Sequence, residues 1–219
     1  MVQKRLRHEE RRNQIIEVSM DLFASRGFKA TTTRAIAKAV GVSEAIIFRH
    51  FVTKNDLYDA IITYTIQKRQ ALWEQEQIDT EDADDLETLL RNYAYAYIRR
   101  NRQDPTFIRL MMYSALQEHK FRELFFEIYR SPHLMAIRKS IEDGIARGVY
   151  RQVNPQLTAR SFLWTLLQYS INRFIAHSPA APVSSDEEIV ENLVSIFLHG
   201  LRNSPTQADQ PVQEASRHE

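Results

Sequence analysis

The chain of 219 residues contains no cysteine and only five glycines, and each shortage excludes particular kinds of functional site. Without cysteine there is no disulfide framework, no thiolate metal site and no cysteine nucleophile. The glycines form no phosphate-cradling loop. No stretch approaches the roughly 20 apolar residues of a membrane span, and no apolar run follows the basic N-terminus as in a secretory signal. We therefore expect a cytoplasmic protein without a membrane partner.

Recognisable catalytic and metal-binding patterns are also missing. The seven histidines include no H-E-x-x-H or similar spacing. Glu118 and His119 could serve as acid and base, but adjacent residues of one helix point in different directions. The acidic run between Asp79 and Asp85 lacks the central glycine of a calcium loop, so we interpret it as a loop that ends in a helix cap. We expect no metal, no cofactor and no catalytic residue, which leaves an enzyme as the least favoured class.

The net charge of +1 conceals an uneven distribution along the chain. Residues 1–54 carry 11 Lys and Arg against 5 Asp and Glu, so their balance is 11 − 5 = +6; the remaining residues carry 18 against 23, so theirs is 18 − 23 = −5. A solvated basic face would also give this balance. A partner rich in phosphate explains it better if the same segment carries a nucleic-acid-binding motif.

Residues 31–57 contain the pattern of two short helices around a tight turn. Ile36, Ala37 and Val40 have the spacing of one apolar helix face, and Gly41 stands where a chain leaving a helix takes up a left-handed conformation. The pattern predicts a first helix that ends at this glycine.

The second helix is predicted over Glu44–Phe51. Ser43 is the expected N-cap, its hydroxyl accepting from free amides of the first turn. Ile47 and Phe51 recur four residues apart and should face the core. The positions left for solvent or for a groove are Glu44, Ala45, Ile46, Phe48, Arg49 and His50.

The flanking segments complete a three-helix unit. Upstream, Asn13–Arg26 is amphipathic, and Gly27 is its expected cap. Downstream, Thr53 and Asp56 have the spacing of a capping box that opens another helix. A glycine-containing turn between two short helices places the second helix in the DNA major groove, although the spacing alone also fits an ordinary helical hairpin. The added helices favour DNA binding.

The segment from about residue 12 to 62 resembles the TetR family of bacterial transcriptional regulators. The matching residues of its T-x-x-x-I-A-x-x-x-G-V-S stretch, recognition helix and lysine are Thr32, Ile36, Ala37, Gly41, Val42, Ser43, Phe48, His50, Phe51 and Lys54. The resemblance implies an all-α fold with an N-terminal three-helix helix-turn-helix domain and a C-terminal helical ligand-binding and dimerisation domain. It also implies a homodimer that binds a palindromic double-stranded DNA operator, most often as a repressor. A small-molecule effector is then expected to release this dimer from the operator.

The resemblance also assigns roles by position. Thr33 and Arg34 match positions that contact phosphate or a base edge, and Lys54 matches a backbone anchor. The groove-facing positions are Ser43, Glu44, Ala45, Ile46, Arg49 and His50. Among these, Arg49 suits guanine, Glu44 suits the amino group of cytosine, and Ala45 or Ile46 suits a thymine methyl. Ala45, Ile46 and Phe48 depart from the residues common in the family, and Phe48 lacks a phosphate-binding hydroxyl, so we expect it to pack.

The remainder of the chain is predicted to be helical. Leu57, Ile61 and Leu72 continue one apolar face well past the motif, which predicts a long connecting helix. Further helices are expected at Leu86–Arg102, Pro105–Glu118, Lys120–Tyr129, Pro132–Arg147, Pro155–Ala176 and Asp186–Asn203. We divide the chain into a flexible basic arm (1–11), the helix-turn-helix domain (12–56), the regulatory and dimerisation domain (57–203) and a disordered tail (204–219).

The last two predicted helices are apolar over most of their circumference. They either belong to the core of one subunit or form a four-helix bundle with a second copy, and the two-fold symmetry of an operator favours the bundle. The expected dimer residues are Phe162, Thr165, Tyr169, Leu193, Val194, Phe197 and Leu201.

Candidate effector-binding residues are apolar or aromatic with a polar end, although each would also suit a plain core. They are Phe107, Met111, Met112, Tyr113, Phe125, Phe126, Trp164, Leu167 and Gln168. The sequence also allows a DNA-binding regulator that has no small-molecule ligand and answers to a protein partner.

Overall fold

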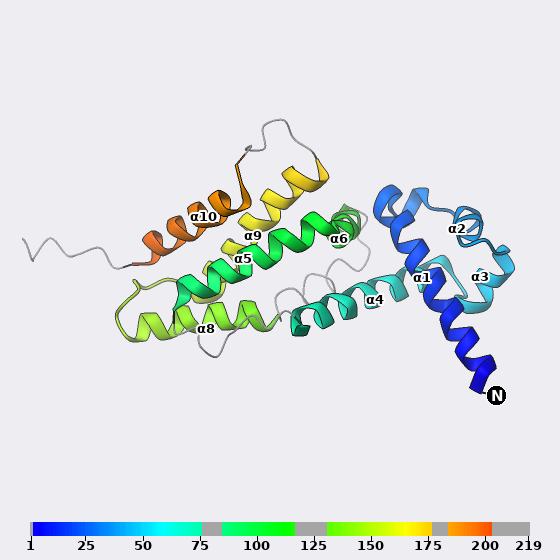
Figure 1. The fold of residues 1–219 in the computed structure, drawn as a ribbon, viewed down its shortest axis with the longest axis horizontal. Helices are drawn as coiled ribbons and strands as arrows, with labels where there is room; N and C mark the ends of the chain where they lie inside the picture. Colours follow the sequence, from blue (N-terminus) through cyan, green and yellow to red (C-terminus); the bar gives the residue numbers. More distant parts are fainter. Residues whose placement is uncertain (1, 76–84, 117–130, 177–183, 203–219) are drawn as a thin grey trace, which may run out of the picture.

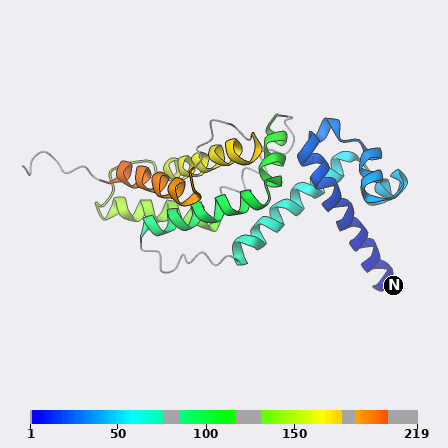
Figure 2. The ribbon, with the colours of Figure 1, turned by 45° about the horizontal axis from the view of Figure 1, so that its top comes forward.

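The computed structural model describes residues 2–75, 85–116, 131–176 and 184–202, and their regular structure is helical apart from one isolated bridge between Tyr150 and Arg202. The helices are α1 (Val2–Ala30), α2 (Thr33–Val40), α3 (Glu44–His50), α4 (Lys54–Gln75), α5 (Leu86–Gln103), α6 (Thr106–Leu116), α8 (Pro132–Ala146), α9 (Pro155–Ser170, continued by a π-helical turn at Ile171–Ile175) and α10 (Asp186–Leu201). Figures 1 and 2 show an elongated molecule with α1–α3 at one end and a helical bundle at the other. The expected all-α class is confirmed.

The sequence predicted where most of these helices begin. Helices α5, α8, α9 and α10 start at the expected residue, and α6 starts one residue later. Pro132 and Pro155 occupy the first turns of α8 and α9, where a missing amide costs least. Asp85 caps α5 by accepting from the amide of Glu87. The expected helix Lys120–Tyr129 and the tail 204–219 lie outside the described residues.

The first helix is longer than the sequence suggested. We expected a flexible arm over residues 1–11, but α1 begins at Val2, and its N-terminal half projects from the body of the molecule (Figure 1). Gly27 interrupts this helix with a φ of 76° and a ψ of 171°, an extended conformation at positive φ that glycine adopts without strain. The chain therefore turns there and leads into α2.

The core of the helix-turn-helix end includes residues from the regulatory part of the chain. Ile15, Phe23, Ile36 and Ile47 are buried there together with Leu57 of α4. The same cluster contains three side chains of α6, namely Phe107, Leu110 and Met111. Helix α6 packs on α1, so the two parts share one hydrophobic core across their junction.

A second core lies within the bundle of α5, α8, α9 and α10. Helix α5 packs against α8, α9 and α10, and the cluster is built mostly from leucine, isoleucine, tyrosine and phenylalanine. Phe162, Val194 and Leu201 are buried in this core, with at most 3% of each side chain exposed. Their assignment to the dimer interface is corrected, because they already pack inside one subunit.

Within the described residues, no helix is sufficiently long and apolar to cross a bilayer. The same residues contain no group of three or more His, Cys, Asp or Glu side chains placed to hold a metal ion.

Candidate DNA-binding surface

The first helix of the motif is fixed at both ends by local interactions. Thr32 caps α2, its hydroxyl accepting from the amide of Ala35 at 3.1 Å. Gly41 ends the helix with a φ of 78°, and its amide donates to the carbonyl of Ala37 at 3.0 Å. The turn that leads to α3 is therefore encoded in the positions that the sequence pattern identified.

The start of α3 differs in one detail from the expectation. Ser43 is the N-cap residue, but its side chain makes no capping hydrogen bond. Its backbone carbonyl accepts instead from the amides of Ile46 and Ile47. The predicted hydroxyl cap is wrong, and the Ser43 side chain is exposed.

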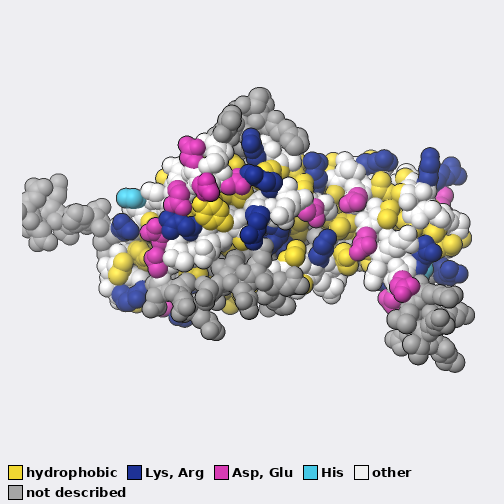
Figure 3. Space-filling view, in the orientation of Figure 1, with side chains coloured by type: hydrophobic (Ala, Val, Ile, Leu, Met, Phe, Trp, Pro, Cys, Tyr) yellow, Lys and Arg dark blue, Asp and Glu magenta, His cyan; other side chains and the backbone are white. Residues whose placement is uncertain are grey.

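Helix α3 divides into a buried and an outward face as predicted. Ile47 and the following Phe51 are buried, whereas Ala45 and Arg49 are exposed. Phe48 is 46% exposed, so it lies on the outward face, among the positions that the sequence left for solvent or a groove. Figure 3 shows dark-blue Lys and Arg side chains along the whole molecule, several of them at the end that carries α2 and α3.

Glu44 is held by the neighbouring helix. The hydroxyl of Thr33 donates to its carboxylate at 2.8 Å, and the guanidinium of Arg34 lies 3.5 Å from the other carboxylate oxygen. Three of the predicted DNA-contacting residues therefore form one network that ties α2 to α3. This network links the starts of the two helices and leaves the carboxylate of Glu44 with acceptor capacity for a further donor.

His50 lies at the C-terminal end of α3 against the first helix. Its ring centroid is 4.3 Å from that of His8, and the Arg12 guanidinium lies 5.1 Å from the centroid of Phe51. Burial lowers the pKa of His50, and the nearby cations lower it further. The sequence reasoning missed His8 and Arg12, since nothing in their spacing shows that α1 runs beside α3.

Lys54 stands at the start of α4, after the predicted capping box. The amide of Thr53 donates to Asp56 at 2.8 Å, and the amide of Asp56 donates to the Thr53 hydroxyl at 3.1 Å, which confirms the box. The Lys54 ammonium lies 4.2 Å from the centroid of the Phe28 ring. Burial lowers the pKa of Lys54. This stacking orients the side chain that we assigned to the DNA backbone.

The candidate effector-binding residues are not gathered in one place. Phe107 and Met111 are buried at the junction with α1 and α4, while Met112 and Tyr113 are half-buried beside them. Leu167 of α9 is half-buried and packs against the same cluster, whereas Trp164 and Gln168 of α9 are exposed. Phe125 and Phe126 lie outside the described residues. Trp164 and Gln168 therefore do not line an interior pocket in this structure.

Comparison with protein families matches both parts of the chain. Residues 15–61 match the model described as "Bacterial regulatory proteins, tetR family". Residues 84–200, more than half of the chain, match the model of the C-terminal domain of AefR-like transcriptional repressors. Among individual relatives, the nucleoid occlusion factor SlmA of Marinobacter nauticus is 23% identical over 87% of this chain and 96% of its own.

Solved structures share the fold over most of the chain. PfmR, a TetR-family transcriptional regulator from Thermus thermophilus, is 24% identical with a TM-score of 0.61, and the match covers 86% of this chain and 99% of PfmR. AibR, solved with isovaleryl coenzyme A and operator DNA, is 21% identical with a TM-score of 0.63 over 85% of this chain and 97% of its own. Both family models describe transcriptional regulators rather than enzymes. The chain belongs to the TetR family of DNA-binding transcriptional regulators.

Proposed function

We propose that the protein is a repressor whose homodimer binds a palindromic operator and releases it when a small molecule binds to the regulatory domain. The observation that carries the proposal is the outward face of α3, where Ala45, Phe48 and Arg49 are exposed on a helix held by α1 and α2. A recognition helix of this kind reads one half-site, and an inverted repeat requires two copies. The match to an AefR-like repressor domain supports the sign of regulation.

The outer faces of α9 and α10 support the dimer. Trp164 and Ile196, large apolar side chains of these two helices, are 43% and 59% exposed in the single subunit. Thr165, Tyr169, Leu193 and Phe197 are half-buried on the same two helices and remain our dimer candidates. Two copies joined by a two-fold axis would cover these faces with each other.

The effector part of the proposal has two supports. AibR was solved with both isovaleryl coenzyme A and operator DNA, which shows that one protein of this fold binds an effector-like molecule and an operator. In the present chain, α6 packs on α1 and shares its core, so a change in the regulatory part has a direct route to the helix-turn-helix end.

The test is selection of bound fragments from randomised DNA by the purified full-length protein, with sedimentation as the measure of its oligomeric state. We expect a dimer that enriches an inverted repeat. Ala45→Glu places a negative charge on the outward face of α3 and should abolish the enrichment. Ala146→Glu makes the same change at the exposed end of α8 and should not. A folded protein that enriches no repeat, or equal enrichment by both variants, would contradict the proposal.

A further inference from the structure

We propose that His8 of α1 and His50 of α3 together form a DNA phosphate contact that takes up a proton on binding, so that the protein holds DNA more tightly as the pH falls. The contact rests on the proposed function and adds a means of regulation to it. The two imidazole rings lie with their centroids 4.3 Å apart and their planes 38° from parallel. His8 precedes the segment 15–61 that matches the family model, so this pair is a feature of the present chain.

The pair lies where the first helix runs beside the end of α3. His50 is the last residue of α3, and the guanidinium of Arg12 on α1 lies 5.1 Å from the centroid of the following Phe51 ring. Arg49, the residue before His50, is exposed on the outward face. A helix in the major groove has a phosphate strand along each rim of the groove, and a neighbouring helix crosses that backbone. The junction of α1 and α3 is placed to meet such a rim.

The free protein disfavours a proton on His50. Its Nδ1 atom is buried and has no hydrogen-bond partner among the described residues, so an N–H there would be left unsatisfied. The neutral tautomer with its proton on Nε2 leaves only a lone pair at that atom. Burial lowers the pKa of His50 below its ordinary value. The neighbouring groups that lower it further are His8, Arg49, Arg12 and Arg11.

A phosphate beside the pair reverses this balance. Its negative charge favours the protonated ring, and it also neutralises the arginines that repel a proton. The side chain of His8 is half exposed, and its Nδ1 atom lies 3.8 Å from the carboxylate of Glu9, which favours a positive charge on the same side. Since the two rings are in contact, a proton on one disfavours a proton on the other. We therefore expect the pair to take up about one proton for each half-site bound.

Proton uptake makes the affinity for DNA depend on pH. By linkage, a proton that binds more tightly to the complex than to the free protein must strengthen DNA binding by the same factor. A neighbouring opposite charge raises the pKa of a histidine by about one unit, which allows a gain of at most about tenfold. The gain develops as the pH falls through the value of the complex and is complete below that of the free protein. Between pH 8 and pH 6 we expect affinity to rise about fivefold.

The experiment is calorimetric titration of the full-length protein with DNA at pH 6.5, in buffers of different ionisation enthalpy, which counts the protons taken up. Dissociation constants are measured alongside from pH 6 to pH 8. Two duplexes are used, the inverted repeat enriched by selection and one of random sequence, because a phosphate contact carries no sequence information. Wild-type protein should take up protons on both duplexes.

The variants replace imidazole by an amide that hydrogen-bonds but does not titrate. His8→Gln and His50→Gln should each reduce the uptake, and the double variant should abolish it and leave an affinity that changes less than about twofold between pH 8 and pH 6. At pH 8 all three should bind within about twofold of wild type, which shows that they are folded. His199→Gln changes an exposed histidine of α10 and is the matched control, with uptake equal to wild type.

Three results would overturn the contact: no proton uptake by the wild-type protein, uptake by the double variant equal to that of the control, or unchanged uptake in His8→Gln. In each case binding to an inverted repeat would still support the proposed function. Proton uptake on random DNA by a protein that enriches no repeat would count against the proposed function and leave the contact standing. A folded protein that binds neither duplex would overturn both.

Discussion

The hydrogen bond between Tyr58 and Ser114 provides a sharp test of the junction. The phenol oxygen of Tyr58 on α4 lies 2.7 Å from the hydroxyl of Ser114 on α6, and 1% and 0% of these residues are exposed. Tyr58→Phe removes one hydroxyl and leaves the other in a buried site with its partner lost. Such a loss costs about 1–3 kcal/mol. For a chain of this size each kcal/mol lowers the Tm by about 2–4 °C.

The assay is thermal unfolding at a fixed protein concentration, since dimerisation contributes to the Tm. Tyr113→Phe is the matched control, because that hydroxyl donates at 3.4 Å on a half-exposed residue of the same helix and should cost less than about 0.5 kcal/mol. The double variant Tyr58→Phe/Ser114→Ala should cost clearly less than the sum of the single variants. Equal losses for Tyr58→Phe and Tyr113→Phe, or strict additivity, would refute the reasoning.

Three further outcomes are expected. Arg49→Ala should relax base preference at one position per half-site by about 1–3 kcal/mol, measured on a panel of operator variants; equal losses on specific and random DNA would exclude base recognition. Because burial and then nearby cations lower the pKa of His50, the unfolded chain binds a proton there more readily, so stability should fall as pH drops below 6.5, and the pH dependence should be shallower in His50→Gln. In Gly144→Ala, the new Cβ would lie 2.1 Å from the Tyr150 ring, so the free energy of unfolding in urea should fall by about 1–3 kcal/mol. Gly200→Ala is the control, because its new Cβ would meet no neighbouring side chain within 4 Å, and its free energy of unfolding should show no such loss.

Sequence reasoning succeeded where structure is set by neighbouring residues. The capping box at Thr53 and Asp56, the left-handed Gly41 and the proline starts of α8 and α9 are all local, and each was found at the expected place. The Ser43 hydroxyl cap failed, although it too is local, because the backbone carbonyl of the same residue opens α3 without it. A pattern of residue types predicts which residue caps a helix better than it predicts which atom of that residue accepts the hydrogen bonds.

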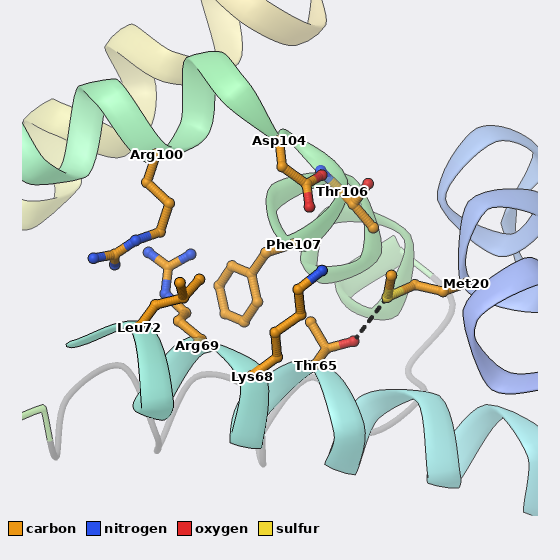
Figure 4. Close-up of a pocket in the computed structure, with 9 residues that line it drawn as sticks. All are labelled: Met20, Thr65, Lys68, Arg69, Leu72, Arg100, Asp104, Thr106 and Phe107. Carbon is orange, nitrogen blue, oxygen red and sulfur yellow. Dashed lines mark hydrogen bonds between the residues drawn. The ribbon is translucent and has the colours of Figure 1, made fainter. Parts of the chain in front are cut away.

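Sequence reasoning succeeded less where the packing partners of a side chain are distant in the chain. A helix that is apolar around most of its circumference shows that it is covered, but not by what, so Phe162 and Val194 could not be assigned to their own subunit from the sequence. Nothing in the sequence distinguishes Arg100 from the other arginines at the end of α5, yet it is buried beside Phe107 (Figure 4). Only the packing of α4, α5 and α6 brings these side chains together.

The shared core has a consequence for engineering hybrid regulators. Phe107, Leu110 and Met111 of α6 complete the apolar cluster around α1 and α4, and no more than 8% of each is exposed. A graft that takes only residues 1–75 into another regulator would leave the sockets of these three side chains open to water. The exchangeable module is therefore discontinuous: a functional chimera has to carry the inner face of α6 with the DNA-reading end, or redesign that face to match its new host.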